Sequence, residues 1–110
     1  MTPVEGLHTS VFLTEDRAIV CVAGEVDFAT APGLRQALQA AVAGGRPLVE
    51  VDFAGVSFCD CSGVNALLGA WQRARADGVA FRVVGVQAAI VTRVFRLLDV
   101  ERVLGLRPAR

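Results

Sequence analysis

The residues best suited to chemistry lie around Ser62, in the short segment 60–63. An apolar run from Val56 to Cys59 leads into this segment, and an apolar helical pattern begins directly after it at Val64. This order predicts a strand, a tight turn and a helix whose first turn carries the Ser62 hydroxyl. The N-terminus of a helix offers unpaired N–H groups and the positive end of the helix dipole, so it favours negative charge. Ser62 is therefore either a helix cap or an acceptor of phosphate.

Enzymatic alternatives find little support. The one histidine, His8, lies far upstream of Ser62, so no serine–histidine–aspartate set is apparent, and no glycine-rich phosphate-binding motif is present. Acid–base chemistry needs paired carboxylates, and five acidic residues follow or lie within the expected strands: Glu25, Asp27, Glu50, Asp52 and Asp60. Acids at such positions are more often solvated or cap helices. We expect a protein that is not an enzyme, has no cofactor and is itself acted upon.

The three cysteines are not expected to form a metal site. Cys59 and Cys61 resemble part of a zinc motif, but four-coordinate zinc would also need Cys21 and His8, which lie far away in expected strands. An odd number of cysteines also argues against a disulfide scaffold and favours a reducing compartment. We expect buried, unreactive thiols and no bound metal.

Composition limits the class of protein. The chain has 110 residues, of which 54% are hydrophobic, and its 11 basic and 11 acidic residues balance. This is enough apolar material for one core and predicts a single domain over residues 1–110. The balanced charge does not indicate nucleic-acid binding, because such domains are usually clearly basic. No stretch of the sequence resembles a signal peptide or a membrane span. We expect a cytoplasmic protein.

The elements alternate in type. Strand patterns cover Leu7 to Thr14, Ala18 to Ala23, Val49 to Phe53 and Phe81 to Val84, and the first two form a hairpin. Helical patterns lie between and after the later strands, at 34–42, 64–74 and 90–98. A short last strand or helix is expected around 102–106, and the tail 107–110 is expected to fray. The fold class is α/β: a four- to five-stranded mixed sheet, with the N-terminal hairpin strand antiparallel, and three or four helices.

The expected second helix has two unlike faces. Its apolar side is predicted to face the core and consists of Val64, Leu67, Leu68, Trp71 and Ala74. Its opposite side is small and polar and consists of Ser62, Asn65, Gly69, Gln72 and Ala76. A glycine in a helix interior costs about 1 kcal/mol relative to alanine, so Gly69 is either tolerated on a solvated face or allows close approach by a partner.

Two segments resemble the STAS domains of anti-sigma factor antagonists. Residues Phe58 to Leu68 resemble the phosphorylation loop and helix of that family, and residues Gly24 to Pro32 resemble the segment joining a strand to the first helix. The order of elements is similar over nearly the whole chain. The chain departs from many relatives at Cys61, where they carry a second hydroxyl residue, and at Asn65, where they carry a small residue.

The resemblance implies a partner-switching protein. In that family the domain binds an anti-sigma factor that is also a serine kinase, which frees a sigma factor for transcription. The kinase then phosphorylates the serine that precedes the glycine, the complex dissociates, and a metal-dependent serine phosphatase restores the binder. On this sequence the implied acceptor is Ser62. The implied partner-binding residues are Asp27, Asp60, Cys61, Gly63, Asn65 and Gly69.

Two alternatives remain open. The chain could be an unswitched STAS scaffold in a lipid-transport or stress-signalling complex, with Ser62 serving only as a helix cap. Direct nucleotide binding is a more remote option that no sequence motif supports.

Overall fold

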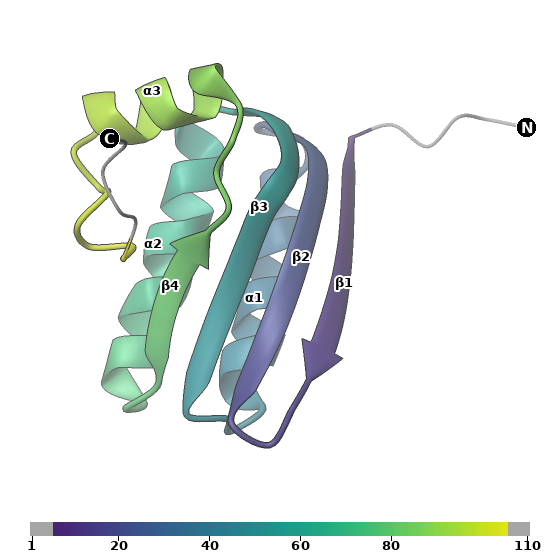
Figure 1. Cartoon of the computed structure of the whole chain (residues 1–110), viewed down its shortest axis with the longest axis vertical. Helices are drawn as coiled ribbons and strands as arrows, with labels where there is room; N and C mark the ends of the chain where they lie inside the picture. The colour runs from purple at the N-terminus through teal and green to yellow at the C-terminus, as the bar shows by residue number, and fades with distance from the viewer. Residues whose placement is uncertain (1–5, 106–110) are drawn as a thin grey trace, which may run out of the picture.

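The computed structural model describes residues 6–105 as an α/β fold with four strands and three helices. Figure 1 shows the elements in chain order. They are β1 (Leu7–Leu13), β2 (Arg17–Val26), α1 (Ala31–Ala43), β3 (Leu48–Cys59), α2 (Cys61–Ala76), β4 (Ala80–Val84) and α3 (Ala89–Leu97).

The sheet has the strand order β1-β2-β3-β4. β1 is antiparallel to β2, whereas β2, β3 and β4 run parallel to one another. The expected mixed sheet with an antiparallel N-terminal hairpin strand is confirmed. Because the three parallel strands point the same way, the segments that leave their carboxyl ends all lie at one end of the sheet, the upper end in Figure 1.

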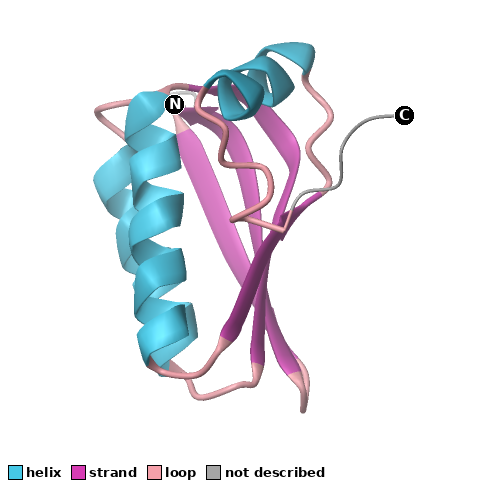
Figure 2. Cartoon of the chain, turned by 90° about the vertical axis from the view of Figure 1, so that its left-hand side faces the viewer, coloured by secondary structure: helices cyan, strands magenta, loops and turns pink. Residues whose placement is uncertain are grey.

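Two helices cover one face of the sheet. Figures 1 and 2 show α1 and α2 side by side on that face, while α3 lies across the upper end. Alternate residues of the central strands point into this layer and are fully buried, among them Val20, Val51 and Phe53. The ring of Phe95, from α3, packs against that of Phe53 with a centroid separation of 5.9 Å. The core therefore also ties α3 to the end of the sheet.

Strand β3 is longer than the sequence pattern predicts. The alternation of apolar and polar residues ends at Phe53, but the strand continues to Cys59, and its last pair with β2 is Val26↔Cys59. Two register shifts in the β2–β3 pairing accompany this extension, and at each one β3 contains one residue more than β2. At Gly55 a Cβ would lie 2.8 Å from the Cβ of Ala23, so only glycine allows the strands to approach this closely here. The extension carries the chain directly to Asp60.

No helix or strand follows α3 within the described residues. The prediction of a short element around 102–106 is wrong for residues 102–105, which form turns; residue 106 and the expected frayed tail lie outside the described residues. The carbonyl oxygen of Leu104 accepts a hydrogen bond from the Val83 N–H at 2.8 Å, and the Leu104 side chain is fully buried. This segment therefore runs along β4 and covers that edge of the sheet.

The predicted apolar faces of two helices need correction. In α2, Ala66 and Ala70 are fully buried, whereas Leu68 and Trp71 are only half-buried. The small alanines allow α2 to pack closely, and this rotates the larger side chains toward the edge of the core. In α3, the outer members of the predicted stripe, Ile90 and Leu98, are exposed. Helix α3 caps the end of the sheet rather than one of its faces, so only a narrow strip of it is covered.

Candidate functional site

Two loops form the candidate site at the carboxyl ends of β2 and β3. The β2–α1 loop runs from Asp27 to Thr30, and the β3–α2 junction is Asp60 alone. The Asp60 N–H donates a hydrogen bond to the carbonyl oxygen of Val26 at 3.1 Å, which fixes one loop against the other. The structure thus brings together segments more than thirty residues apart in the chain.

Asp60, not Ser62, caps helix α2. Asp60 has extended backbone angles, and its carboxylate Oδ1 accepts a hydrogen bond from the Ser62 N–H at 2.9 Å. Its carbonyl oxygen accepts from the N–H groups of Gly63 and Val64 at 3.1 and 3.2 Å. The possibility that the Ser62 side chain is a helix cap is therefore wrong.

The Ser62 hydroxyl takes part in no hydrogen bond among the described residues. Ser62 is the second residue of α2 and is half-buried, and its Oγ has no hydrogen-bond partner among residues 6–105. No buried side-chain oxygen or nitrogen in this part of the chain lacks a partner, so the hydroxyl reaches solvent. The geometry presents a free hydroxyl in the first turn of a helix, close to the positive end of its dipole.

Gly63 lets the first turn of α2 lie directly on the strand ends. A Cβ at this position would lie 2.5 Å from both the Cys59 Sγ and the Val26 Cγ1. Gly63 is itself buried, so within this structure it positions Ser62 rather than offering a surface to a partner. This is the physical reason for a glycine directly after the serine.

Asp27 organises the neighbouring loop. Its Oδ1 accepts hydrogen bonds from the N–H groups of Ala29 and Thr30, each at 3.0 Å. The Thr30 hydroxyl accepts from the Asp27 N–H at 2.9 Å and donates to the Glu25 carbonyl oxygen at 2.9 Å. Thr30 precedes the first residue of α1, but its side chain stabilises this loop and does not cap the helix. The Asp27 carboxylate thus shapes the loop that stands beside Ser62.

Phe28 is a candidate site residue that the sequence reasoning missed. It lies at the tip of the Asp27–Thr30 loop, and its side chain is 84% exposed, the most exposed of the large hydrophobic residues described. The available signal is the position of a large apolar residue inside a turn, where no core can cover it. Exposed aromatic rings are common anchors in protein interfaces.

The thiols of Cys59 and Cys61 differ in burial, although only one residue separates them. Burial, aided by the nearby Asp60 charge, raises the pKa of Cys59 to about 12, so this thiol is inert as expected. Cys61 is exposed on the first residue of α2, so the expectation of a buried thiol is wrong there. Cys61 adds a small, uncharged side chain to the surface around Ser62.

The outward face of α2 continues this surface. Asn65 and Gln72 are exposed and Gly69 is half-buried, as the helical periodicity predicts. A Cβ at Gly69 would meet no atom within 4 Å, so the packing of the described chain does not require a glycine there. The result is a low strip of small or uncharged side chains from Ser62 to Gly69, and the exposed Arg73 lies one turn beyond it.

Two of the acidic residues, Glu50 and Asp52, bind groups of their own. Glu50 pairs with Arg17 and Arg82 on the face of the sheet opposite α1 and α2, and these arginines hold its pKa below the usual range. The Asp52 Oδ1 accepts a hydrogen bond from the Ala54 N–H at 2.9 Å. Among residues 6–105, no three histidine, cysteine or acidic side chains are grouped to hold a metal ion.

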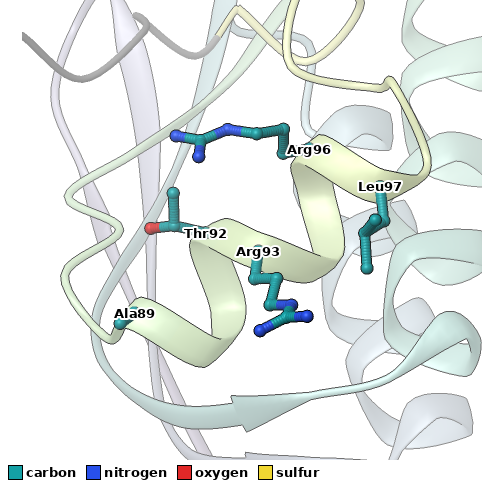
Figure 3. Close-up of a pocket in the computed structure, with 5 residues that line it drawn as sticks. All are labelled: Ala89, Thr92, Arg93, Arg96 and Leu97. Carbon is teal, nitrogen blue, oxygen red and sulfur yellow. The ribbon is translucent and has the colours of Figure 1, made fainter.

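Helix α3 flanks the site at the same end of the sheet. Its outer surface forms a shallow pocket lined by Ala89, Thr92, Arg93, Arg96 and Leu97. Figure 3 shows Thr92 and Arg96 on one side of the helix and Arg93 and Leu97 on the other.

No helix in the described part of the chain is long and apolar enough to cross a membrane.

Comparison with known proteins identifies the fold and the family. A family model described as "Mlab, STAS domain" matches residues 10–108, whereas the sequence has no match among curated proteins. An anti-sigma factor antagonist from Mycobacterium paratuberculosis has a similar structure, with 27% sequence identity, a TM-score of 0.85, and coverage of 99% of this chain and 92% of that chain.

Two more distant structures share the fold. The Bacillus cell fate determinant SpoIIAA in its phosphorylated form is 19% identical with a TM-score of 0.69, and covers 94% of this chain and 92% of its own. The anti-sigma factor antagonist SpoIIAA in its unphosphorylated form is 20% identical with a TM-score of 0.67, over 92% of this chain and 100% of its own. With a family model that spans almost all of its residues, the chain belongs to the STAS domain family.

Proposed function

We propose that this protein is an anti-sigma factor antagonist switched by phosphorylation of Ser62. It binds an anti-sigma factor that is a serine kinase, and so releases a sigma factor. Phosphorylation by that kinase ends the interaction, and a metal-dependent serine phosphatase restores it. The observation that carries this proposal is the division of labour in the first turn of α2: Asp60 caps the helix, so the Ser62 hydroxyl remains free.

The fold can accept a phosphate at this position. A phosphoserine adds a charge of about −1.5 to −2, and the first turn of a helix favours negative charge through its dipole. The Ser62 Oγ gives up no hydrogen bond within residues 6–105 when it is modified. The modification therefore leaves the helix and the core intact.

Phosphorylation of Ser62 would strongly weaken binding of the partner. The Asp60 carboxylate binds the Ser62 N–H, so a phosphate at Ser62 places a second negative group beside an existing one. The surrounding surface from Cys61 to Asn65 and Gly69 is otherwise low and uncharged, which suits close contact with a protein. Like charges brought together at an interface cost several kcal/mol, enough to weaken binding by orders of magnitude.

The residues around Ser62 divide into two roles in this proposal. Phe28, Cys61, Asn65 and Gly69 form the contact surface. Asp27, Asp60 and Gly63 hold the two loops in position through their hydrogen bonds and packing. In this proposal the domain acts as a binding partner in the cytoplasm and requires no catalysis, cofactor or nucleic acid of its own. Its 11 basic and 11 acidic residues balance, which fits a protein partner better than nucleic acid.

The comparisons support the proposal at a coarse level. The M. paratuberculosis protein carries the name of an anti-sigma factor antagonist, and SpoIIAA has been solved in a phosphorylated form. The matching family model is described as "Mlab, STAS domain" and names no anti-sigma role, which leaves a second candidate: an unswitched STAS scaffold in a lipid-transport or stress-signalling complex. In that case Ser62 would lie against a permanent partner and carry no phosphate.

A binding comparison in the native host tests the proposal. Tagged wild-type protein, Ser62→Ala and Ser62→Asp are purified, and the co-purifying proteins are quantified by mass spectrometry. We expect Ser62→Ala to retain an ATP-binding serine kinase and Ser62→Asp to lose it at least tenfold. Ser57→Asp is the control, because Ser57 is exposed on β3 and does not lie at a helix N-terminus. Equal recovery of the kinase by Ser62→Ala and Ser62→Asp would contradict the switch, and recovery of a permease or transport ATPase instead would favour the scaffold.

A further inference from the structure

The two edges of the sheet differ in whether another segment of the chain covers them. The β4 edge is covered, because the Leu104 carbonyl oxygen accepts a hydrogen bond from the Val83 N–H. Among residues 6–105, no segment pairs with the outer edge of β1. An edge strand with free backbone groups is a template for pairing with another chain, and proteins usually guard such edges with charge, proline or a bulge.

Strand β1 carries none of these guards. Its sequence, Leu7 to Leu13, contains no charged residue, proline or glycine, and its pairing with β2 shows no register shift. Three of its large side chains are strongly exposed: Val11 at 46%, Phe12 at 58% and Leu13 at 57%. β1 therefore combines an open edge with an apolar surface, which is typical of a strand that pairs with a partner.

The hydrogen-bond pattern shows which backbone groups are free. The Thr14 N–H donates to Arg17, and the Gly6 carbonyl oxygen accepts from Glu25, so even-numbered residues of this strand face β2. Because the pattern alternates along an antiparallel ladder, the N–H and C=O groups of Leu7, Thr9, Val11 and Leu13 point outward.

We propose that β1 pairs with β1 of a second copy of this chain, antiparallel and centred on Ser10. In this register Leu7 lies opposite Leu13 of the second copy, and Thr9 lies opposite Val11. These are the residues whose backbone groups point outward, so each pair can exchange two hydrogen bonds. On the other face of the sheet, Phe12 lies opposite His8. The strand is self-complementary in this register, as a two-fold interface requires.

We expect a weak dimer that cannot add further copies. Pairing two seven-residue strands with these exposed side chains covers an area on the order of 1,000 Å², the lower end for specific interfaces. Because an interface of this size is small and its pairing is mostly through backbone groups, we expect reversible association rather than a permanent dimer. The contact uses the open edge of both copies, so growth stops at two. Because the strands are antiparallel, the two Ser62 loops lie at opposite ends of the joined sheet, and each copy can bind its own partner. The pairing does not depend on the function proposed for Ser62.

Analytical ultracentrifugation from micromolar to near-millimolar concentration tests the proposal. We expect a monomer–dimer equilibrium for the wild type. Val11→Pro removes an outward N–H without touching the β2 ladder, and should weaken dimerisation at least tenfold while circular dichroism shows an unchanged fold. Leu97→Lys is the matched control, because Leu97 is 73% exposed on α3, and should dimerise like the wild type. A wild type that stays monomeric at near-millimolar concentration, or one that grows beyond a dimer, overturns the proposal.

A cross-link tests the register independently of Val11→Pro. Ser10 would lie opposite its own copy in a pair without hydrogen bonds, where the Cα atoms are about 4.5 Å apart, a distance that a disulfide can bridge. Ser10→Cys is made with Cys21→Ala and Cys61→Ser, because Cys21 is paired with Ser10 within the chain and Cys61 is exposed. Mild oxidation should give a covalent dimer, and Thr9→Cys in the same background should give at least tenfold less. Equal cross-linking of both variants, or of neither, contradicts the proposed pairing.

Discussion

Helices α1 and α2 begin side by side at the same end of the sheet, yet their first turns are built for different purposes. Thr30 precedes α1 and uses its side chain within the Asp27 loop, whereas Asp60 precedes α2 and caps it directly. The second helical residue is Pro32 in α1, which has no N–H to donate and no functional group. In α2 the same position is Ser62, whose hydroxyl is free.

The third helical residue of each helix is a glycine, but the two glycines are not equivalent. A Cβ at Gly33 would meet nothing within 4 Å, whereas a Cβ at Gly63 would meet Cys59 and Val26 at 2.5 Å. At the start of α1, Ala31 is buried but Pro32 and Gly33 are exposed, so no strand end lies beneath the glycine. The start of α2 is held down on the strand ends so that one hydroxyl is presented at a fixed place. The contrast suggests that the α2 junction is shaped by function and the α1 junction mainly by folding.

Thiol labelling should give the largest contrast at the α2 junction. At pH 8 a thiol with a pKa of about 12 is ionised to roughly one part in ten thousand, so Cys59 should resist iodoacetamide in the folded protein. Cys61 is exposed and should react at least a hundred times faster. Peptide mass spectrometry over time measures both rates. If Cys59 reacted as fast as Cys61, the first turn of α2 would not be packed on β3 as described.

Alanine at the two glycines should change stability in opposite directions. Gly63→Ala forces the Cβ against Cys59 and Val26 and should destabilise the fold by about 1–3 kcal/mol, as overpacking does. Gly33→Ala is the matched control and should stabilise it by up to about 1 kcal/mol, because alanine is the better helix former. Urea denaturation measures both changes in the free energy of unfolding. Changes of the same sign would remove the distinction between the two helix starts.

The cap at Asp60 should have a smaller effect. Asp60→Ala removes the acceptor of the Ser62 N–H and should lower the free energy of unfolding by about 1 kcal/mol. Asp60→Asn keeps an acceptor oxygen and should cost only a fraction of this. The same urea denaturation experiment distinguishes them. If Asp60→Ala were as stable as the wild type, another group, Ser62 included, would be supplying the cap.

The sequence predicts well whatever depends on local periodicity. The strand pattern at 18–23, the helical pattern at 34–42 and the position of Asp60 and Ser62 at a helix start all follow from short-range patterns. The structure has these elements, with β2 longer than predicted, at Arg17–Val26. The length of β3 does not follow, because residues 54–59 are held by pairing with β2 and not by an alternating pattern of their own.

Features that depend on tertiary packing could not be predicted from the sequence either. The burial of Ala66 and Ala70 and the exposure of Ile90 depend on where each helix lies against the sheet. The role of Gly63 becomes visible only when the Cys59 and Val26 side chains are placed beneath it. Phe28 was missed for a related reason: its position in a turn can be read from the sequence, but its exposure also requires that no other element covers the loop.

Mapping of phosphate on the protein purified from its native host tests the central claim most directly. Intact-mass spectrometry is combined with peptide mapping of the segment 55–73, for the wild type and for Ser62→Ala. The account predicts one phosphate, located on Ser62 and absent from Ser62→Ala, whose occupancy changes with growth conditions. An unmodified Ser62 under every condition, while the partner remains bound, would contradict the switch and leave the free hydroxyl without the role proposed for it.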